Sequence, residues 1–313
     1  MRLGLVKLPN GRSGEGDLTA VFDQLRLADK LGLHLAYLSK FTPFQLSSFR
    51  PSQDISLGIG LDAAAFGALA PRKMEAAVRG VNDHLYGRLY LGVETCAAGS
   101  SRKSRTAAQN YETLFSVHTK FDKAPTRAGF PMTPPCPKIV GLPGFGAPQE
   151  TALAAARGYL PLTPSWLPAR DVARHWPALV EGATSALRRA RPLHWNLARM
   201  IVVHDDPALI NAYVFDPNSP IRSYYAQLAK RGLLVSDLDD HLAEAVIAGS
   251  ADKVADDILA LQETVGEIGT LHMIDPPTGD PKMIRTTMTN MAEKVITLVN
   301  RSEARIPKEL ERT

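Results

Sequence analysis

A glycine-rich loop between two apolar runs holds the residues best suited to bind a charged ligand. Gly141, Gly144 and Gly146 let the backbone turn so that several amide hydrogens converge. A helix is predicted to begin near Pro148, and the free amides of its first turn carry partial positive charge. Thr151 adds a hydroxyl group. This pattern fits a phosphate site at a helix N-terminus, and it also fits a tight strand-to-helix turn that binds nothing.

Two further side chains are candidates for catalysis because each ends an apolar run that is predicted to be a strand. Glu94 ends one run, where a buried carboxylate would cost free energy without a partner. His204 lies at the end of another run, whereas the remaining histidines are interpreted as surface or core residues. No Ser-His-Asp order, HExxH, Walker A or GxGxxG motif is present, and no histidine pair has metal-ligand spacing. The sequence therefore predicts no metal site.

An alternation of strands and helices must position these residues. Apolar residues recur at helical spacing from Leu18 to Leu31, and Gly32 ends that segment. Further helices are predicted over residues 71–85, 104–118, 251–265 and 281–300, and from residue 148 onward. The predicted strands cover residues 2–8, 33–38, 55–61, 87–94, 138–142, 159–163, 198–205 and 270–274.

About eight strands, most of them followed by a helix, predict a (β/α)8 TIM barrel that forms one domain over residues 1–313. Ligands of such barrels bind at the carboxyl ends of the strands, which makes Lys7, after the first strand, a candidate pocket residue. The segment 41–54 contains two prolines and is too short for a full helix. We therefore expect a shortened crossover after the second strand.

The composition disfavours several classes of protein. The 313 residues are 45% hydrophobic and carry a net charge of only +4, which argues against nucleic acid binding. No run approaches the roughly 18 apolar residues that a membrane span needs, and the N-terminus lacks the pattern of a signal peptide. Cys96 and Cys136 form no disulfide framework or metal spacing. We expect a cytoplasmic protein without a membrane partner.

Four segments, in this order, resemble the bacterial luciferase-like, flavin-dependent monooxygenases. The first is "LRLADKLGLHLAYLSKF", which is similar to the family's first helix and second strand. The second runs from "ISLGIGL" to "APRKMEAAVRGVNDHLYGRLYLGVE", and the third is "ETALAAARGYLPLTPSW". The fourth, "AGSADKVADDILALQETVGEIGTLHMI" followed by "MAEKVITLVN", looks closest to the alkanal and limonene monooxygenase branch. The resemblance spans nearly the whole chain.

The resemblance implies a luciferase-like barrel that binds reduced FMN supplied by a separate flavin reductase. In that family the reduced flavin reacts with O2 to give a flavin peroxide, which attacks an organic substrate. The protein would then bind the cofactor, exclude water and position the substrate, because the cofactor carries the chemistry. Homodimers are common in the family, so we expect a dimer by analogy.

The resemblance also implies roles for individual residues. Ten positions are expected to contact the cofactor: Gly60, Leu61, Glu94, Thr95, Gly144, Gly146, Ala147, Thr151, Ser165 and Trp166. Gly146, Ala147 and Thr151 fall on the phosphate-binding turn, and Ser165 and Trp166 on the segment that lines the isoalloxazine. Gly60–Leu61 falls where several members have a non-proline cis peptide. Glu94 and Thr95 match the strand end that carries a reactive cysteine and a phosphate-binding arginine in luciferase.

Three departures from the family bear on activity. Ser39, Lys40 and Phe41 replace an acidic-histidine-histidine motif whose histidine luciferase uses in catalysis. Thr95 replaces the phosphate-binding arginine, although three basic residues follow closely in sequence: Arg102, Lys103 and Arg105. The crossover after the second strand is shortened. These departures favour a non-catalytic flavin-binding protein as one alternative.

We therefore expect a reduced-FMN-dependent two-component monooxygenase that acts on a small or medium apolar molecule. The first alternative is an F420-dependent oxidoreductase with the same barrel, and the second is a flavin-binding protein without turnover. Lys7, Phe41 and Phe44 are expected in the substrate pocket, with Phe49 and Phe130 as further candidates. The pocket has no pattern that identifies the substrate.

Overall fold

The computed structural model describes residues 1–8, 18–39, 41, 43–46, 49, 57–62, 71–95, 138–143, 146–234, 237–277 and 279–303. Several predictions lie outside these residues: the helix at 104–118, Phe130, Lys40, Gly144, Arg102, Lys103 and Arg105.

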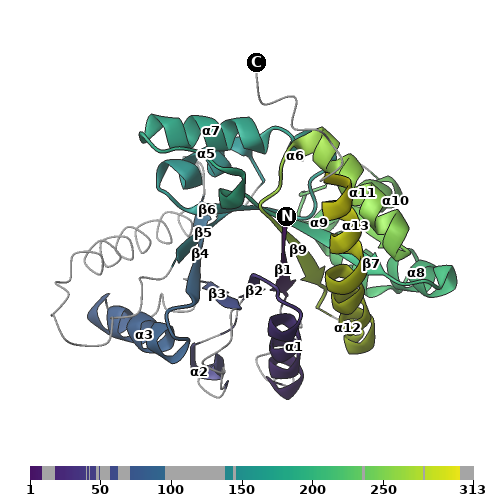
Figure 1. Cartoon of the computed structure of the whole chain (residues 1–313), viewed down its shortest axis with the longest axis horizontal. Helices are drawn as coiled ribbons and strands as arrows, with labels where there is room; N and C mark the ends of the chain where they lie inside the picture. Colours follow the sequence, from purple (N-terminus) through teal and green to yellow (C-terminus); the bar gives the residue numbers. More distant parts are fainter. Residues whose placement is uncertain are drawn as a thin grey trace.

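The described strands form a closed parallel barrel (Figure 1). They are β1 (Arg2–Lys7), β2 (Leu35–Leu38), β3 (Gly58–Asp62), β4 (Leu89–Thr95), β5 (Lys138–Pro143), β6 (Leu160–Thr163), β7 (Asn196–Val203), β8 (Val246–Gly249) and β9 (Thr270–Asp275). Strands β1 to β6 pair in sequence order, β6 pairs with β7, β7 with β9, and β9 with β1, which closes a ring of eight strands. The predicted (β/α)8 barrel is confirmed.

Strand β8 is an addition that the sequence pattern did not predict. Strand β7 pairs with β9 as far as Arg199, and from Met200 onward it pairs with β8. Because β8 has only four residues and follows a helix directly, it shows no strand period of its own. Strand β7 therefore exchanges its neighbour β9 for β8 after Arg199.

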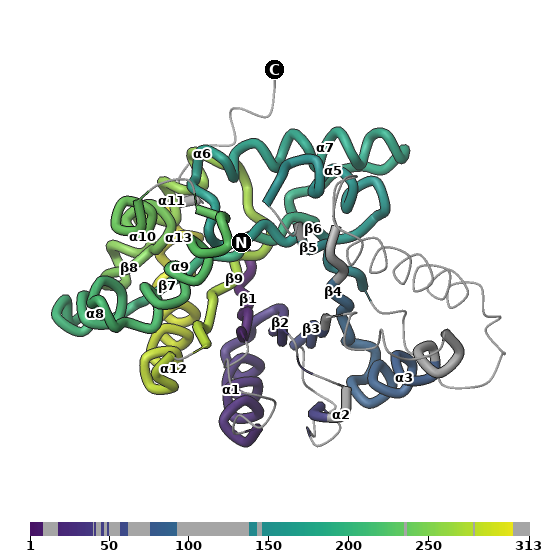
Figure 2. The backbone as a smooth tube through the Cα atoms, turned by 180° about the vertical axis from the view of Figure 1, so that it is seen from behind, coloured from purple at the N-terminus to yellow at the C-terminus, as the bar shows by residue number. Residues whose placement is uncertain are grey.

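Helices surround the strands, as the tube in Figure 2 shows. They are α1 (Leu18–Lys30), α2 (Pro43–Leu46), α3 (Pro71–His84), α5 (Pro148–Ala156), α6 (Ala169–Val172), α7 (His175–Ser185), α8 (Pro207–Val214), α9 (Pro220–Lys230), α10 (Leu238–Ala245), α11 (Ala251–Val265), α12 (Pro281–Asn290) and α13 (Ile296–Glu303), with a 3-10 turn at Pro192–His194 and a π-helical turn at Met291–Val295. Helices α8, α9 and α10, which were not predicted, lie on the side of the molecule opposite α3.

Predicted helix ends are confirmed where a single residue defines them. Pro71 and Pro148 are the first residues of α3 and α5. The Ser250 hydroxyl accepts a hydrogen bond from the Lys253 amide at the start of α11. Gly266 ends α11 with a φ of +88°, a conformation that favours glycine. In the described part of the chain, no helix has the length and apolar character of a membrane span.

Two hydrophobic clusters divide the interior. The larger one lies between the strands and the helices that cover them, and it includes Leu5, Leu25 and Ile258. The second holds the alternate strand residues, which face the inside of the barrel, and it continues into α8, α9 and α10. Tyr37 belongs to this second cluster. Helices α8 to α10 therefore share a core with the barrel interior.

Candidate functional site

Polar side chains from three elements meet just beyond the carboxyl end of β6. The Ser165 carbonyl accepts hydrogen bonds from the Tyr225 hydroxyl of α9 and from Nη1 of Arg199 in β7, both at 3.4 Å. The Ser165 hydroxyl lies 3.5 Å from the hydroxyl of Tyr224. Burial raises the pKa of both tyrosines, so both hydroxyls are neutral at pH 7.

Arg199 is a buried cation in this group. Arg199 is 1% exposed. Besides the bond to the Ser165 carbonyl, its Nη1 donates a hydrogen bond to the Ala198 carbonyl at 3.2 Å. Nη2 is buried without a hydrogen-bond partner, and no carboxylate of the described residues pairs with the guanidinium. Burial lowers the pKa of Arg199 to about 10, which leaves it charged at pH 7.

Trp166 contributes a second unsatisfied donor at the same corner. The residue is half-buried, and its indole Nε1 is buried without a hydrogen-bond partner. Buried polar groups in folded proteins are almost always hydrogen-bonded. Trp166 and Arg199 therefore present donors for which the described residues offer no acceptor.

The predicted phosphate loop ends in a buried turn, and one of its amide donors is already bonded within the protein. Gly146 adopts a φ of +70°, as a tight turn requires, but it is buried, and an added Cβ would lie 3.1 Å from Leu167. The amide of Ala147 donates to the carboxylate of Glu150 at 3.2 Å. Pro148 has no amide hydrogen. A carboxylate of the protein therefore occupies one of the few donors that the N-terminus of α5 offers.

Thr151, which is predicted to contact the phosphate, has another partner within the protein in this structure. Its hydroxyl is fully buried and lies 2.7 Å from Nδ1 of His175, which is in α7. Helical geometry places Thr151 on the face of α5 that packs against α7, so the hydroxyl joins two helices.

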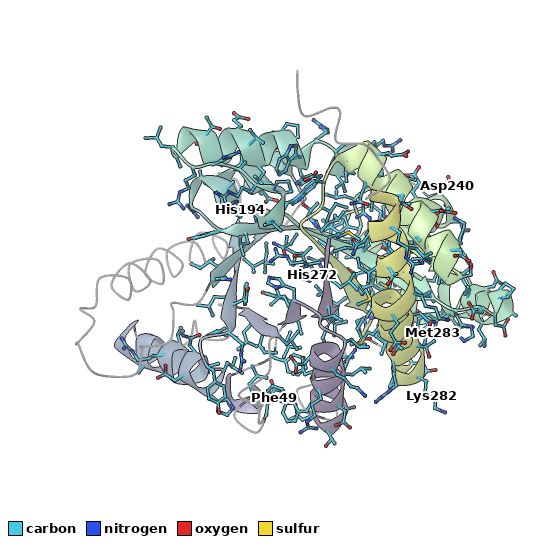
Figure 3. The ribbon with its side chains drawn as sticks, in the orientation of Figure 1. Phe49, His194, Asp240, His272, Lys282 and Met283 are labelled. Atoms are coloured by element: carbon cyan, nitrogen blue, oxygen red, sulfur yellow. The ribbon has the colours of Figure 1, made fainter. Side chains whose placement is uncertain are left out.

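Three buried histidines predict an acid-sensitive fold. Burial lowers the pKa of His34 and His175 to about 4 and that of His272 to about 3, and Figure 3 shows His272 amid the strands. All three are neutral when folded and bind protons when unfolded below about pH 6.5. Stability is therefore complete above that pH and is lost as the pH falls toward 4, by up to about 3 kcal/mol per pH unit for the two protons that the fully buried His175 and His272 exclude.

Urea unfolding at pH 7.5, 6.0 and 5.0 measures this loss. The variant His272→Asn should show a slope shallower by about 1.4 kcal/mol per pH unit, since one proton less is taken up. An equal free energy of unfolding at pH 7.5 and 5.0 in the unaltered protein contradicts the prediction.

Lys7 does not face a substrate pocket as predicted. Its ammonium group forms an ion pair with Asp275 at the end of β9, and Gln24 of α1 donates to the same carboxylate oxygen at 3.0 Å. Gln24 also contacts the sulfur of Met288 in α12. This cluster lies on the helix-facing side of the strands, so Lys7 fastens β1 and β9 to α1.

The aromatic residues expected in the pocket are also placed elsewhere. Phe41 packs against the outer hydrophobic cluster. Phe49 is fully buried there, with its ring 5.4 Å from that of Phe22 in α1, and Figure 3 shows it at the α1 side of the molecule. Phe44 lies in α2, and its side chain is outside the described part. The segment after β2 therefore folds onto α1 where it is described.

Gly60 is explained by packing inside the barrel. A Cβ at this position would lie 3.1 Å from two ring carbons of Tyr37, with a third closer still. All peptide bonds of the described residues are trans, so the cis peptide expected at Gly60–Leu61 is absent from the structure. Leu61 is buried in the outer cluster. Glu94 and Thr95 end β4, and their side chains are not described.

His204 is placed in the turn between β7 and α8. Its amide donates to the Gly249 carbonyl at 3.0 Å, and its Nδ1 accepts a hydrogen bond from the Asp206 amide at 2.9 Å. The ring is half-buried and lies beside β8, outside the closed ring of strands. The structure does not bring it to Trp166 and Arg199 by any described contact. Among the residues that the structure describes, no group of three potential ligands could hold a metal ion.

One feature of the sequence marks Arg199 as a candidate site residue, although it is not among the predicted site residues. Arg199 is the one charged residue within the otherwise apolar run "ARMIVV". A charge inside a buried parallel strand is rare without a specific function. Tyr224 and Tyr225, in contrast, lie in a helix without any pattern that marks them.

Solved structures with the same barrel identify the fold. A search of family profiles finds no match, and a search of curated protein sequences finds none either. The oxygenating constituent of 3,6-diketocamphane monooxygenase from Pseudomonas putida, in complex with FMN, superposes with a TM-score of 0.76 at 17% identity, covering 96% of this chain and 98% of that one. A monooxygenase from Streptomyces bottropensis gives 0.70 at 16% identity, covering 95% and 99%.

A third structure with this fold uses a different cofactor. The coenzyme F420-dependent tetrahydromethanopterin reductase from Methanopyrus kandleri gives a TM-score of 0.64 at 14% identity, covering 95% of this chain and 98% of that one. At these identities the likeness shows the fold alone. The chain thus shares with these structures the (β/α)8 barrel fold that its sequence predicted.

Proposed function

We propose that the protein is a reduced-FMN-dependent monooxygenase that acts on a small or medium apolar molecule together with O2. The observation that carries this proposal is the pair of buried donors without acceptors, Trp166 Nε1 and Arg199 Nη2. They lie just beyond the carboxyl end of β6 and beside β7, in a barrel whose fold binds ligands at that face. The fold is shared with an FMN-bound monooxygenase component.

The residues at this corner fit a flavin. The isoalloxazine ring has carbonyl oxygens and ring nitrogens that accept hydrogen bonds, and FMN also carries a phosphate. The half-buried indole of Trp166 offers a flat surface with a donor, and the Arg199 guanidinium offers a charge. Tyr224 and Tyr225 cover Ser165 and keep water away from it.

When bound, reduced flavin supplies the electrons that activate O2. The chain's own residues would bind the ring, orient it through Trp166 and keep the corner dry. We propose that a separate reductase supplies the reduced flavin in a transient encounter. A homodimer, a cytoplasmic location and membership of the alkanal and limonene branch belong to the same proposal.

F420-dependent oxidoreduction is the second candidate function. It is favoured by the fold shared with the Methanopyrus kandleri reductase. A flavin-binding protein without turnover is a third outcome, favoured by Phe41 at the family's histidine position and its packing in the outer cluster.

Titration with FMN and with F420 tests the proposal. We expect FMN to bind and the Trp166→Phe variant to bind it about fivefold more weakly, because one hydrogen bond is lost while the aromatic surface remains. The matched control is Trp176→Phe, since Trp176 stacks on Trp195 with ring centroids 5.9 Å apart and makes no described contact with this corner.

Turnover is measured as substrate-dependent O2 consumption with a flavin reductase and NADH. Binding of F420 alone selects the second candidate, and FMN binding without turnover selects the third. Absence of binding by either cofactor at tens of micromolar excludes all three.

A further inference from the structure

Arg199 lies at the point in β7 where the strand changes its pairing partner from β9 to β8. Strand β6 pairs with β7 at Leu162 and Thr163, and β7 leaves β9 after Arg199 to pair with β8. The ladder between β6 and β7 ends at the pair Thr163 and Leu197, so Arg199, two residues further along β7, lies in the seam where β6 and β7 part. Its contact with the Ser165 carbonyl bridges that seam.

The ionisable groups that the structure describes around Arg199 are neutral at pH 7. Tyr225 of α9 has a pKa raised by burial, and His175 of α7 and His241 of α10 have pKa values lowered by burial. Their own pKa values respond to the charge of Arg199, which shows that they are close enough to interact with it. No carboxylate of the described residues offsets this buried charge.

Two hydrogen bonds to carbonyls satisfy only part of the guanidinium, which has five N–H donors. Leaving a buried cation without a counter-charge destabilises a fold by several kcal/mol. A planar guanidinium fork matches the two oxygens of a carboxylate or phosphate. Trp166 Nε1 is a second free donor near the same Ser165 corner.

The N-terminus of α5, the other place where an anion was expected, already holds a carboxylate. Glu150 is fully buried and accepts a hydrogen bond from the Ala147 amide. A second anion there would meet this carboxylate at close range, which is unfavourable. The uncompensated positive charge of the described core lies instead at Arg199.

We propose that Arg199, assisted by the indole N–H of Trp166, binds an oxyacid anion, a carboxylate or a phosphate, that belongs to a ligand. The anion site itself requires no redox activity. Its two candidate sources are the phosphate of the cofactor and a single acid group on an otherwise apolar substrate, and naming either of them rests on the proposed function.

Thermal unfolding in matched salts tests the anion site. In sodium phosphate and in sodium acetate, compared with sodium chloride of equal ionic strength, the melting temperature of the unaltered protein should rise with anion concentration. Arg199→Met should abolish the rise, and without added anion this variant should be at least as stable as the parent, because a buried charge has been removed. Arg26→Met, at an exposed pair with Asp23, is the matched control and should leave the response unchanged.

Arg199→Lys keeps the charge without the fork, and it should keep part of the anion response. This variant carries the test if Arg199→Met does not fold. An anion response that is absent in the unaltered protein, or that is equal in the parent and the Arg199 variants, overturns the proposal and makes the arginine a structural residue.

Titration with FMN and riboflavin separates the two sources. If the anion is the cofactor's phosphate, Arg199→Met should weaken FMN at least tenfold and leave riboflavin unchanged. If it is an acid group of the substrate, Arg199→Met leaves the affinity for both flavins unchanged, and only the thermal protection by phosphate and acetate is lost. Failure of all flavin binding with the anion response intact would overturn the proposed function and leave the anion site standing.

Discussion

Replacing Gly182 with alanine is expected to destabilise the protein by about 3 kcal/mol, because the new methyl group would overlap backbone. Gly182 is buried in α7, which packs on α5 (Figure 1). A Cβ at this position would lie 2.6 Å from the carbonyl carbon of Ala152 and 2.7 Å from its Cα, with the carbonyl oxygen closer still. A side chain can rotate away from such a contact, but helix backbone cannot. The two helices must therefore move apart and lose their close packing.

The matched control is Gly80→Ala in α3. Gly80 is exposed in a helix, and an added Cβ would meet nothing within 4 Å. Alanine should stabilise this helix by about 0.5–1 kcal/mol. Urea unfolding of both variants gives the comparison. Equal free energies of unfolding for Gly182→Ala and the parent protein would show that Gly182 of α7 does not pack closely against the backbone of Ala152 in α5.

The barrel could be predicted from the sequence because its strands are buried on both faces and its helices carry local stop signals. Strands β1 and β9 read as continuous apolar runs, and Ser250 and Gly266 bound α11 by their own chemistry. The four residues of β8 show no period of their own. Helix α8 is apolar and largely exposed, so it lacks the apolar stripe that would mark it.

The site could be predicted only in part because most of its contacts join residues far apart in the chain. The family resemblance predicts Ser165 and Trp166 as cofactor contacts, and the structure places the Ser165 carbonyl 3.4 Å from Nη1 of Arg199. Thr151 was read as a phosphate contact because nothing local shows that His175 lies against it. Lys7 pairs with Asp275 from the opposite end of the chain. Such pairings follow from closure of the barrel and are invisible to periodicity.

Gly92→Ala is the second substitution with a large expected effect, because it tests how tightly the barrel interior is filled. Tyr37 reaches from β2 across Gly60 of β3 to Gly92 of β4, and the tyrosine is buried. A Cβ at Gly92 would lie 2.8 Å from Cε2 of Tyr37, with the hydroxyl closer still. Tyr37 is buried in the inner hydrophobic cluster, so its ring can shift only by displacing packed neighbours, and we expect a loss of about 2–3 kcal/mol.

A double-mutant cycle assigns that loss to Tyr37. In a Tyr37→Leu background the shorter side chain leaves space for the methyl group, so Gly92→Ala should cost less than about 1 kcal/mol there. An equal cost in both backgrounds would contradict the proposed contact. Since Tyr37 fills the barrel at the level of Gly60 and Gly92, a ligand that enters from the carboxyl ends of the strands must remain above this layer.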